Sequence, residues 1–270
     1  MLIRTTTTLQ LLSRLGHAIY GVYAVLVFLL LGSIALILVT LVPGLGMNRR
    51  RAVAHYMAQA FFHCAGMRVK VTGEELLPST PCVVVANHAS YIDGIVLKAF
   101  LPARFSFVIK KEVTKVPLAG LLLKRIGSEF VDRFNRHAGA MDARRLMKAA
   151  DAGQSLVFFP EGTFVERPGV GKFHTGAFAI AARVGLPVVP VAIRGTRYIL
   201  PSSRYLPRFG RIEIDILPPL PVGTTDAANV LAIRDQARAR IVSALGEPDL
   251  AHDDGVAAIA ARKSPPSARL

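Results

Sequence analysis

The chain contains 270 residues, of which 52% are hydrophobic and 19% are charged, and 33 Lys and Arg against 18 Asp and Glu leave a net charge of +15. A mean hydropathy of +0.42 with so few charged residues excludes a disordered or fibrous chain and indicates contact with a membrane. The two cysteines, Cys64 and Cys82, form no CxxC pair, which excludes a disulfide framework and a cysteine-rich zinc site and favours a reducing compartment.

An uncharged apolar segment lies near the N-terminus, where no Asp, Glu, Lys or Arg occurs between Arg14 and Arg49. As a helix, residues 17–42 would extend about 39 Å, which exceeds the roughly 30 Å of a hydrocarbon core. The segment is too long for the apolar core of a signal peptide, so we predict that residues 1–48 form a retained membrane anchor. Basic residues flank both ends, and only the arginine triplet 49–51 favours a cytoplasmic C-terminal part. Spanning the bilayer and dipping into one leaflet are both compatible with this pattern.

Residues 49–68 follow with apolar positions at helical spacing and with polar residues on the other faces. We interpret them as an amphipathic interfacial helix that lies on the bilayer surface or covers the next domain. His55 and His63 could share a face of this helix. Because no carboxylate or third ligand lies nearby in the sequence, we expect no metal site there.

Beyond residue 68, short β-branched segments alternate with helical ones, which is the pattern of an α/β domain. We predict a mostly parallel central sheet flanked by helices over residues 69–248, and a disordered tail rich in Ala, Pro, Ser and Arg over residues 249–270. The predicted strands are 68–71, 82–86, 106–109, 129–131, 155–159, 188–193 and 211–216. The predicted helices are 92–100, 117–126, 137–152, 176–184 and 226–245.

Polar and charged residues follow four of these predicted strands. Ligands of open α/β sheets bind beyond the carboxyl ends of the strands, so we expect these side chains to converge on one face of the domain. In chain order they are Asn87, His88 and Asp93, then Lys110, Lys111 and Glu112, then Asp132 and Arg133, and finally Glu161, Gly162 and Thr163.

His88 and Asp93 are five residues apart, which on a continuous helix would separate them by about 140°. The histidine must therefore precede the helix. Ser90 and Asp93 have the spacing of a capping box, which predicts that the helix begins at Tyr91 and leaves His88 in the turn. A carboxylate folded against the imidazole would fix its tautomer and leave the other nitrogen free to act as a base. In the plainer alternative, Asp93 only caps the helix and His88 is an ordinary turn residue.

Glu161 and Gly162 come directly after an apolar strand. Gly162 has no side chain, so backbone N–H groups there could approach an anion closely. A carboxylate at the end of an apolar run is costly to bury unless it is paired, and Arg133 or Lys111 could supply the partner. In the alternative, this pair is a structural ion pair that pins two loops together. The following stretch, 167–171, is typical of a mobile loop beside the site.

Over about residues 69–220 the sequence resembles the glycerolipid acyltransferases of the 1-acylglycerol-3-phosphate acyltransferase family. A lone HxxxxD is common by chance, whereas NHxxxxD followed by FPEGT in the same domain is specific. The four family blocks occur in order as Asn87-His88 with Asp93 (NHxxxxD), residues 127–133 ending in Arg, residues 159–163 (FPEGT), and the apolar residues 186–191 with two prolines.

The resemblance implies transfer of a fatty acyl group from acyl-CoA or acyl carrier protein to the hydroxyl of a lysophospholipid, in the first place 1-acylglycerol-3-phosphate, which gives phosphatidic acid. His88 would act as the general base and Asp93 would orient it, with no covalent acyl-enzyme. No metal or redox cofactor would be needed. The residues that would bind the acceptor are Arg133, Glu161, Gly162, Thr163 and Lys111, with the planar guanidinium of the arginine on phosphate.

Two departures from the family pattern bear on the acceptor. Phe164 stands where Arg usually follows FPEGT, and Phe173-His174 stands where Phe-Lys is typical, although Lys172 could substitute. With fewer cations available for a phosphate, another lysophospholipid or a lyso-ornithine-type aminolipid is the alternative acceptor.

Other classes of protein fit the sequence less well. No GxSxG elbow occurs, so a serine hydrolase is not indicated, although water at His88 could give thioester hydrolysis. A non-enzymatic basic membrane protein would also carry a charge of +15, but the cations are spread along the chain and no nucleic-acid module is visible, so we expect no nucleic-acid partner. A basic surface equally suits anionic membrane lipids or an acidic carrier protein. The predicted location is the inner (cytoplasmic) membrane with the catalytic domain facing the cytoplasm.

Overall fold

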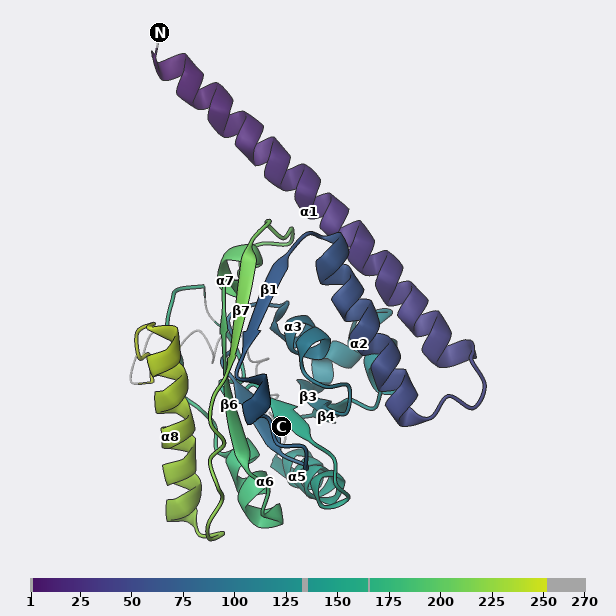
Figure 1. Cartoon of the computed structure of the whole chain (residues 1–270), viewed down its shortest axis with the longest axis vertical. Coiled ribbons are helices and arrows are strands. Elements are labelled where there is room, and N and C mark those ends of the chain that lie inside the picture. The colour runs from purple at the N-terminus through teal and green to yellow at the C-terminus, as the bar shows by residue number, and fades with distance from the viewer. Residues whose placement is uncertain (1, 133–135, 165, 252–270) are drawn as a thin grey trace, which may run out of the picture.

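The computed structural model describes residues 2–132, 136–164 and 166–251. A seven-stranded sheet has the order β1-β7-β6-β2-β5-β3-β4 (Figure 1). Every neighbouring pair of strands is parallel except β6 and β7, which run antiparallel. The predicted α/β class with a mostly parallel central sheet is therefore confirmed.

The observed strands begin and end within one residue of the predicted bounds, because each is a short β-branched or apolar run. They are β1 (Arg68–Thr72), β2 (Val83–Ala86), β3 (Ser106–Lys110), β4 (Glu129–Val131), β5 (Leu156–Phe158), β6 (Val188–Arg194) and β7 (Arg211–Ile216). The helices of the domain are α3 (Asp93–Phe100), α4 (Ala119–Arg125), α5 (Arg136–Asp151), α6 (Gly176–Val184) and α8 (Ala227–Leu245). Short helices too brief to show a helical period were not predicted, namely η1 (Glu74–Leu76), η2 (Lys111–Lys115) and α7 (Thr196–Ile199).

Helices cover both faces of the sheet. β2 is buried along its whole length, and its alternate side chains belong to two hydrophobic clusters: Val84 to one, Val83 and Val85 to the other. The first cluster includes side chains of α2 and α3, and the second includes side chains of α5, α6 and α8 (Figure 1). The sheet is therefore the middle one of three layers, and the carboxyl ends of β2, β5 and β3 lie at one edge.

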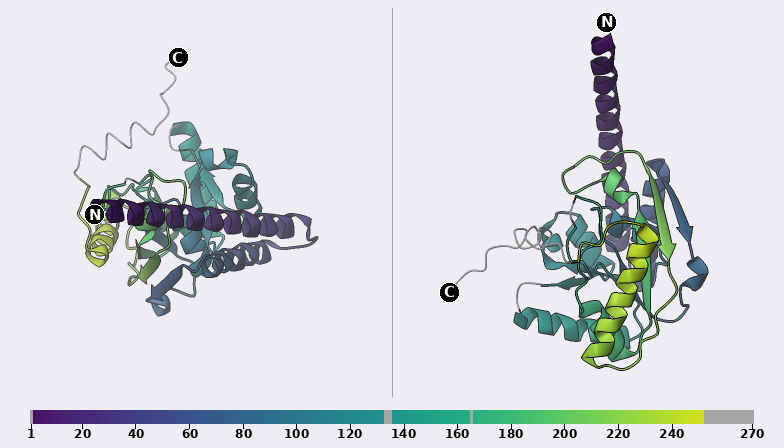
Figure 2. Two further views of the ribbon diagram at one scale, coloured as in Figure 1. Left: turned by 90° about the horizontal axis from the view of Figure 1, so that it is seen from above. Right: turned by 90° about the vertical axis from the view of Figure 1, so that its left-hand side faces the viewer.

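Two helices precede the sheet. α1 (Leu2–Leu41) is longer than the predicted segment 17–42, and α2 (Met47–Cys64) packs against it and against α3. The amphipathic helix therefore covers the domain, and it ends before residue 68, which is the first residue of β1. Figures 1 and 2 show the N-terminal part of α1 standing clear of the other elements. The part of α1 from Ser13 to Leu41 is long and apolar enough to cross a membrane, and 22% of its apolar window is buried inside the protein.

The two faces of α1 have different surroundings. On one face, Tyr20, Val27 and Leu31 pack against the first hydrophobic cluster. The other face is a stripe of exposed apolar side chains at helical spacing, made of Leu15, Ile19, Val22, Leu26, Leu30, Ile37 and Leu41. α1 thus contacts the protein along one side and leaves the opposite side apolar and uncovered.

Arg51 ties α2 to the sheet domain. Its buried guanidinium donates hydrogen bonds to the carbonyl oxygens of Ile126 (3.1 Å), Gly127 (3.2 Å) and Arg104 (3.1 Å), and to Oε1 of Gln154 (3.2 Å). Burial lowers the pKa of this guanidinium, and these acceptors replace the water it has lost. The helix pair is therefore joined to the domain by polar as well as apolar contacts.

Candidate functional site

The site begins where β2 ends, and Asn87 holds the chain at that point. The buried amide of Asn87 donates from Nδ2 to the carbonyl oxygen of Ile193 (3.0 Å) and accepts from the Ile193 N–H at Oδ1 (2.7 Å). Both polar groups of the side chain are thus used to join the end of β2 to β6. The residue before His88 is fixed by the sheet itself, a role that the sequence analysis did not assign.

His88 and Asp93 are brought into contact. Nδ1 of His88 lies 2.8 Å from Oδ2 of Asp93, and the carboxylate is fully buried. The same oxygen accepts the backbone N–H groups of Ala89 (2.7 Å) and Ser90 (2.8 Å). Because Nδ1 must carry the proton to donate to a carboxylate, the other ring nitrogen, Nε2, is left with a free lone pair. Asp93 therefore orients the imidazole, and the same oxygen also closes the turn that precedes α3.

The start of α3 differs from the capping box predicted from the sequence. α3 begins at Asp93 rather than at Tyr91. The carboxylate does reach back to the Ser90 N–H, but Oγ of Ser90 donates to the carbonyl oxygen of Leu200 (2.6 Å) and accepts from the N–H of Ile92 (3.3 Å). Only half of the box forms, because the hydroxyl is engaged by a loop far away in the sequence.

Aromatic rings enclose the imidazole. The ring of Phe159 stacks on His88 at a centroid distance of 4.4 Å and an interplanar angle of 25°, and the ring of Phe164 contacts it at 4.5 Å. The edge of Tyr91 in turn meets Phe164 at 4.9 Å. The His88 side chain keeps 21% of its surface exposed. With Nδ1 engaged and rings packed against it, the edge that carries Nε2 is the one left for a substrate.

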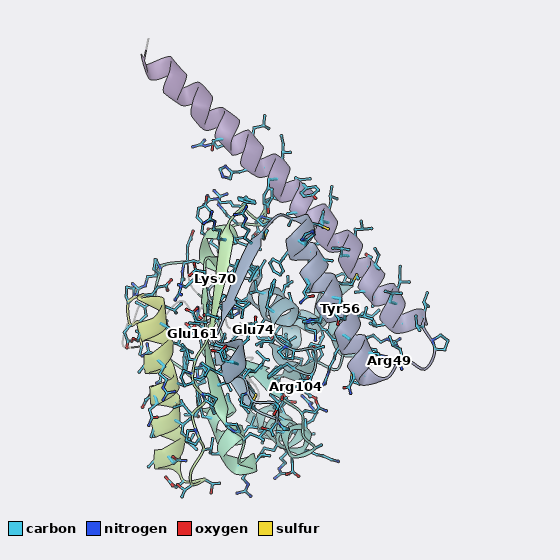
Figure 3. All side chains as sticks on the ribbon, viewed as in Figure 1. Arg49, Tyr56, Lys70, Glu74, Arg104 and Glu161 are labelled. Carbon is cyan, nitrogen blue, oxygen red and sulfur yellow. The ribbon has the colours of Figure 1, made fainter. Side chains whose placement is uncertain are left out.

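Glu161, labelled in Figure 3, follows β5 and binds backbone groups from two loops. Oε1 accepts the N–H of His88 (2.7 Å) and Oε2 accepts the N–H of Gly171 (2.7 Å). Burial raises the pKa of this carboxyl to about 7, although both hydrogen bonds and the nearby charge of Arg197 oppose the rise. Glu161 therefore joins the histidine turn to the loop that follows its own turn.

A cation, Lys111 or Arg133, was expected as the partner of Glu161, and the described structure tests only Lys111. Nζ of Lys111 lies 3.6 Å from Oδ2 of Asp132, and the lysine side chain is 64% exposed. Arg133, the other predicted partner, lies outside the described residues. The donors seen on Glu161 are backbone N–H groups of two loops, His88 and Gly171.

Gly162 and Thr163 complete this turn. Gly162 has a φ of 74°, in the left-handed region that favours glycine, and its N–H donates to the carbonyl oxygen of Phe159 (3.0 Å). Its N–H is therefore used to close the turn that presents Glu161, while Thr163 is half-buried beside it. The stretch 167–171, predicted to be mobile, is hydrogen-bonded to residues 247–250 near the C-terminus.

No metal cluster accompanies these residues in the part of the chain that the structure describes, where no group of three His, Cys, Asp or Glu side chains could hold an ion. Lys172 and His174 are exposed on the loop that follows Gly171. The described site thus consists of an oriented imidazole, two carboxylates that bind backbone groups, and an aromatic surround. Chemically it can take a proton from a group that approaches Nε2.

This chain is similar in sequence to known acyltransferases. A family model described as Acyltransferase matches residues 68–194, which include β1 through β6. A lyso-ornithine lipid O-acyltransferase from Pseudomonas aeruginosa is 32% identical over 211 aligned positions, and the match covers 70% of this chain and 77% of that protein. A chloroplastic 1-acyl-sn-glycerol-3-phosphate acyltransferase from Brassica napus is 31% identical over 202 aligned positions, and the match covers 73% of this chain and 57% of that protein.

A solved structure shares the fold. The crystal structure of the 1-acyl-sn-glycerophosphate acyltransferase of Thermotoga maritima superposes with a TM-score of 0.69 at 23% identity and covers 94% of this chain and 99% of that one. This chain spans little more than half the length of the chloroplastic relatives it matches, 57% and 55% of the two proteins. The residues matched by the family model, 68–194, include His88, Asp93 and Glu161.

Proposed function

Because the chain belongs to the acyltransferase family, we propose that it transfers a fatty acyl group from a thioester donor to the free hydroxyl of a lysolipid at a membrane. The observation that carries the proposal is the contact of 2.8 Å between Nδ1 of His88 and the buried Asp93 carboxylate, which leaves Nε2 as the base. The donor is acyl-CoA or acyl carrier protein, and the positive net charge of the chain suits the acidic character of either.

The proposed reaction uses His88 twice. Nε2 takes the proton of the acceptor hydroxyl while the alkoxide oxygen attacks the thioester carbonyl, and Asp93 stabilises the imidazolium that forms. The tetrahedral intermediate then expels the thiolate, which takes the proton back from the imidazolium. No acyl-enzyme is formed, and the chemistry consists of proton transfer and acyl transfer, so it calls for neither a metal nor a redox cofactor.

The proposed acceptor is a lysophospholipid, in the first place 1-acylglycerol-3-phosphate. Thr163 and Lys111, at the ends of neighbouring strands, and Arg133 in the family block are the residues we assign to binding it. Glu161 and Gly162 contribute by shaping the turn.

A second acceptor is favoured by Phe164. Its ring packs against His88 at 4.5 Å and against Tyr91. An aromatic ring at this distance from the base offers no hydrogen bond to a phosphate and suits an apolar or zwitterionic part of the acceptor. A lyso-aminolipid, the acceptor named for the Pseudomonas relative, is therefore the second candidate.

We propose that α1 holds the enzyme at the cytoplasmic face of the inner membrane. Its exposed apolar stripe lies opposite the face that packs on the domain, which suits a helix lying along the bilayer with the stripe in one leaflet. The acceptor, itself a membrane lipid, would then reach the site without leaving the membrane.

The test is an acyl-transfer assay on the full chain in lipid or detergent, with a panel of lysolipids and with both donors. His88→Ala should lower kcat by at least about two orders of magnitude, the usual effect of removing a general base. His63→Ala, at an exposed position on α2, is the matched control and should leave kcat unchanged. Turnover in His88→Ala equal to that of the wild type would refute the mechanism, and thioester hydrolysis without any transfer would make the protein a thioesterase.

A further inference from the structure

The loop 166–172 that follows the Glu161 turn is paired with residues 247–250, which we call the C-terminal strap. The backbone N–H and C=O of Val170 both bond to the strap, at 3.0 and 2.9 Å, in a parallel bridge. The N–H of Gly169 donates to a carboxylate oxygen of Glu247 (2.7 Å). Residues 249–251, predicted to belong to a disordered tail, are therefore described and pack on the loop beside the site, and the rest of that predicted tail, 252–270, lies outside the described residues.

A buried arginine of α8 joins the strap to the loop. The guanidinium of Arg238, 9% exposed, binds both oxygens of the Asp249 carboxylate at 2.7 and 2.5 Å. The same group donates to the carbonyl oxygens of Val170 and Gly171, each at 2.8 Å. A bidentate pair with two additional carbonyl acceptors fixes a guanidinium in one orientation. The position of the Gly171 peptide thus depends on the strap.

A second arginine also joins the strap to the loop. Arg197, on α7, donates to Glu247 in the strap (2.8 Å) and to the carbonyl oxygens of Arg167 (2.7 Å) and Gly169 (3.3 Å) in the loop. Arginines from two helices, together with the strap, therefore bind the backbone of this loop.

The loop is connected to the imidazole by a short chain of hydrogen bonds. The carbonyl oxygen of Gly171 is held by Arg238, its N–H donates to Oε2 of Glu161, and Oε1 of Glu161 accepts the N–H of His88. The approach is close, because a Cβ atom at Gly171 would lie 3.0 Å from Oε2 of Glu161. Moving the Gly171 peptide must therefore move, or leave unpaired, the carboxylate that anchors His88.

We propose that the C-terminal strap positions the base: Arg238 and Asp249 are positioning residues that act on His88 through Gly171 and Glu161. This rests on the proposed function. If the strap is released, Glu161 loses one of its two donors and can rotate, so the His88 turn loses a fixed anchor. Displacing a catalytic group by about 1 Å can cost on the order of a hundredfold in rate. A strap that only stabilised the fold would change the unfolding temperature and leave kcat of the folded enzyme alone.

The test compares three variants of the full chain. Asp249→Ala removes the carboxylate that holds Arg238, Asp249→Glu restores it, and Asp235→Ala removes an aspartate paired with Arg234 elsewhere on α8. Assayed well below their unfolding temperatures, Asp249→Ala should lose about ten- to a hundredfold in kcat with KM for donor and acceptor unchanged. Asp249→Glu should recover most of that loss, and Asp235→Ala should match the wild type.

A wild-type kcat in Asp249→Ala, or an equal loss in Asp235→Ala, would overturn the proposal. Amide hydrogen exchange tests the effect of the strap on His88 independently of the proposed acyltransferase activity. If the wild type transfers no acyl group to any lysolipid, the acyltransferase assignment is wrong. Amide hydrogen exchange then still tests whether the strap positions His88. Faster exchange of the His88 amide in Asp249→Ala than in Asp235→Ala supports the coupling, and equal exchange overturns it.

Discussion

Glu161 should make the stability of the protein depend on pH in an unusual direction. Its carboxyl is withdrawn from water, which raises its pKa from an ordinary 4.5 to about 7 even though two backbone N–H groups favour the ionised form. The folded state therefore binds this proton more tightly than the unfolded state does. Stability from this group is complete below pH 4.5 and is lost as the pH rises through 7.

The size of the effect follows from the difference between the two pKa values. At roughly 1.4 kcal/mol per pKa unit, the rise from 4.5 to about 7 corresponds to about 3 kcal/mol. Because titration of the unfolded state has already begun at pH 5, about 2 to 3 kcal/mol of this should be lost between pH 5 and pH 8. Most acidic residues act in the opposite direction, so the sign is diagnostic.

The measurement is the free energy of unfolding by urea, in detergent, for the wild type and for Glu161→Gln from pH 5 to pH 8. The amide cannot titrate, and the mismatch of its NH₂ group with one backbone N–H adds a penalty that is independent of pH. The wild type minus the variant should therefore fall by about 2 to 3 kcal/mol as the pH rises. Glu75→Gln, an exposed position on η1, controls for the loss of a carboxylate. A difference that stays flat, or that grows with pH, would refute the reasoning.

Three further changes test other parts of the structure. Asn87→Ala leaves the N–H and C=O of Ile193 without their partner and should lower the free energy of unfolding by about 2 to 4 kcal/mol in urea titrations. A loss below about 1 kcal/mol would contradict the role of Asn87 in joining β2 to β6. Arg51→Met removes the donors that join α2 to the domain and should lower the free energy of unfolding by about 3 kcal/mol, measured as a lower unfolding temperature. An unchanged unfolding temperature would show that apolar packing alone holds α2. Phe164→Arg places a guanidinium near His88 and should raise kcat/KM for 1-acylglycerol-3-phosphate relative to a lyso-aminolipid by about tenfold. An unchanged ratio of the two kcat/KM values would show that this position does not determine acceptor choice.

The elements of the sheet could be predicted because local sequence and tertiary structure agree there. β2, for example, is an uninterrupted β-branched run buried on both faces, which is the composition of a central parallel strand. The contact between His88 and Asp93 was also predictable, since their spacing excludes a shared helical face and places the histidine in the turn before the helix. Both inferences use distances of only a few residues along the chain.

The contacts of Glu161 could not be predicted in this way. Its carboxylate oxygens accept the backbone N–H groups of His88 and Gly171, and a backbone donor has no side-chain signature in the sequence. The partners of the loop 167–171 could not be predicted for a related reason. Its glycines predict mobility, but Arg238 and the C-terminal strap, distant in the sequence, supply the partners that hold it.

The two carboxylates of the site are occupied by the protein itself, and this bears on where acceptor specificity resides. Glu161 accepts the N–H of His88, and Asp93 accepts those of Ala89 and Ser90, so successive amides of one turn are bound by side chains. Both oxygens of Glu161 are bonded and the Asp93 carboxylate is fully buried, so neither is open to a substrate hydroxyl and both serve to fix the base. Substitutions of Glu161 should therefore act on kcat through the position of His88, while discrimination between lysolipids should come from residues that line the approach to Nε2, of which Phe164 is in direct contact with the imidazole.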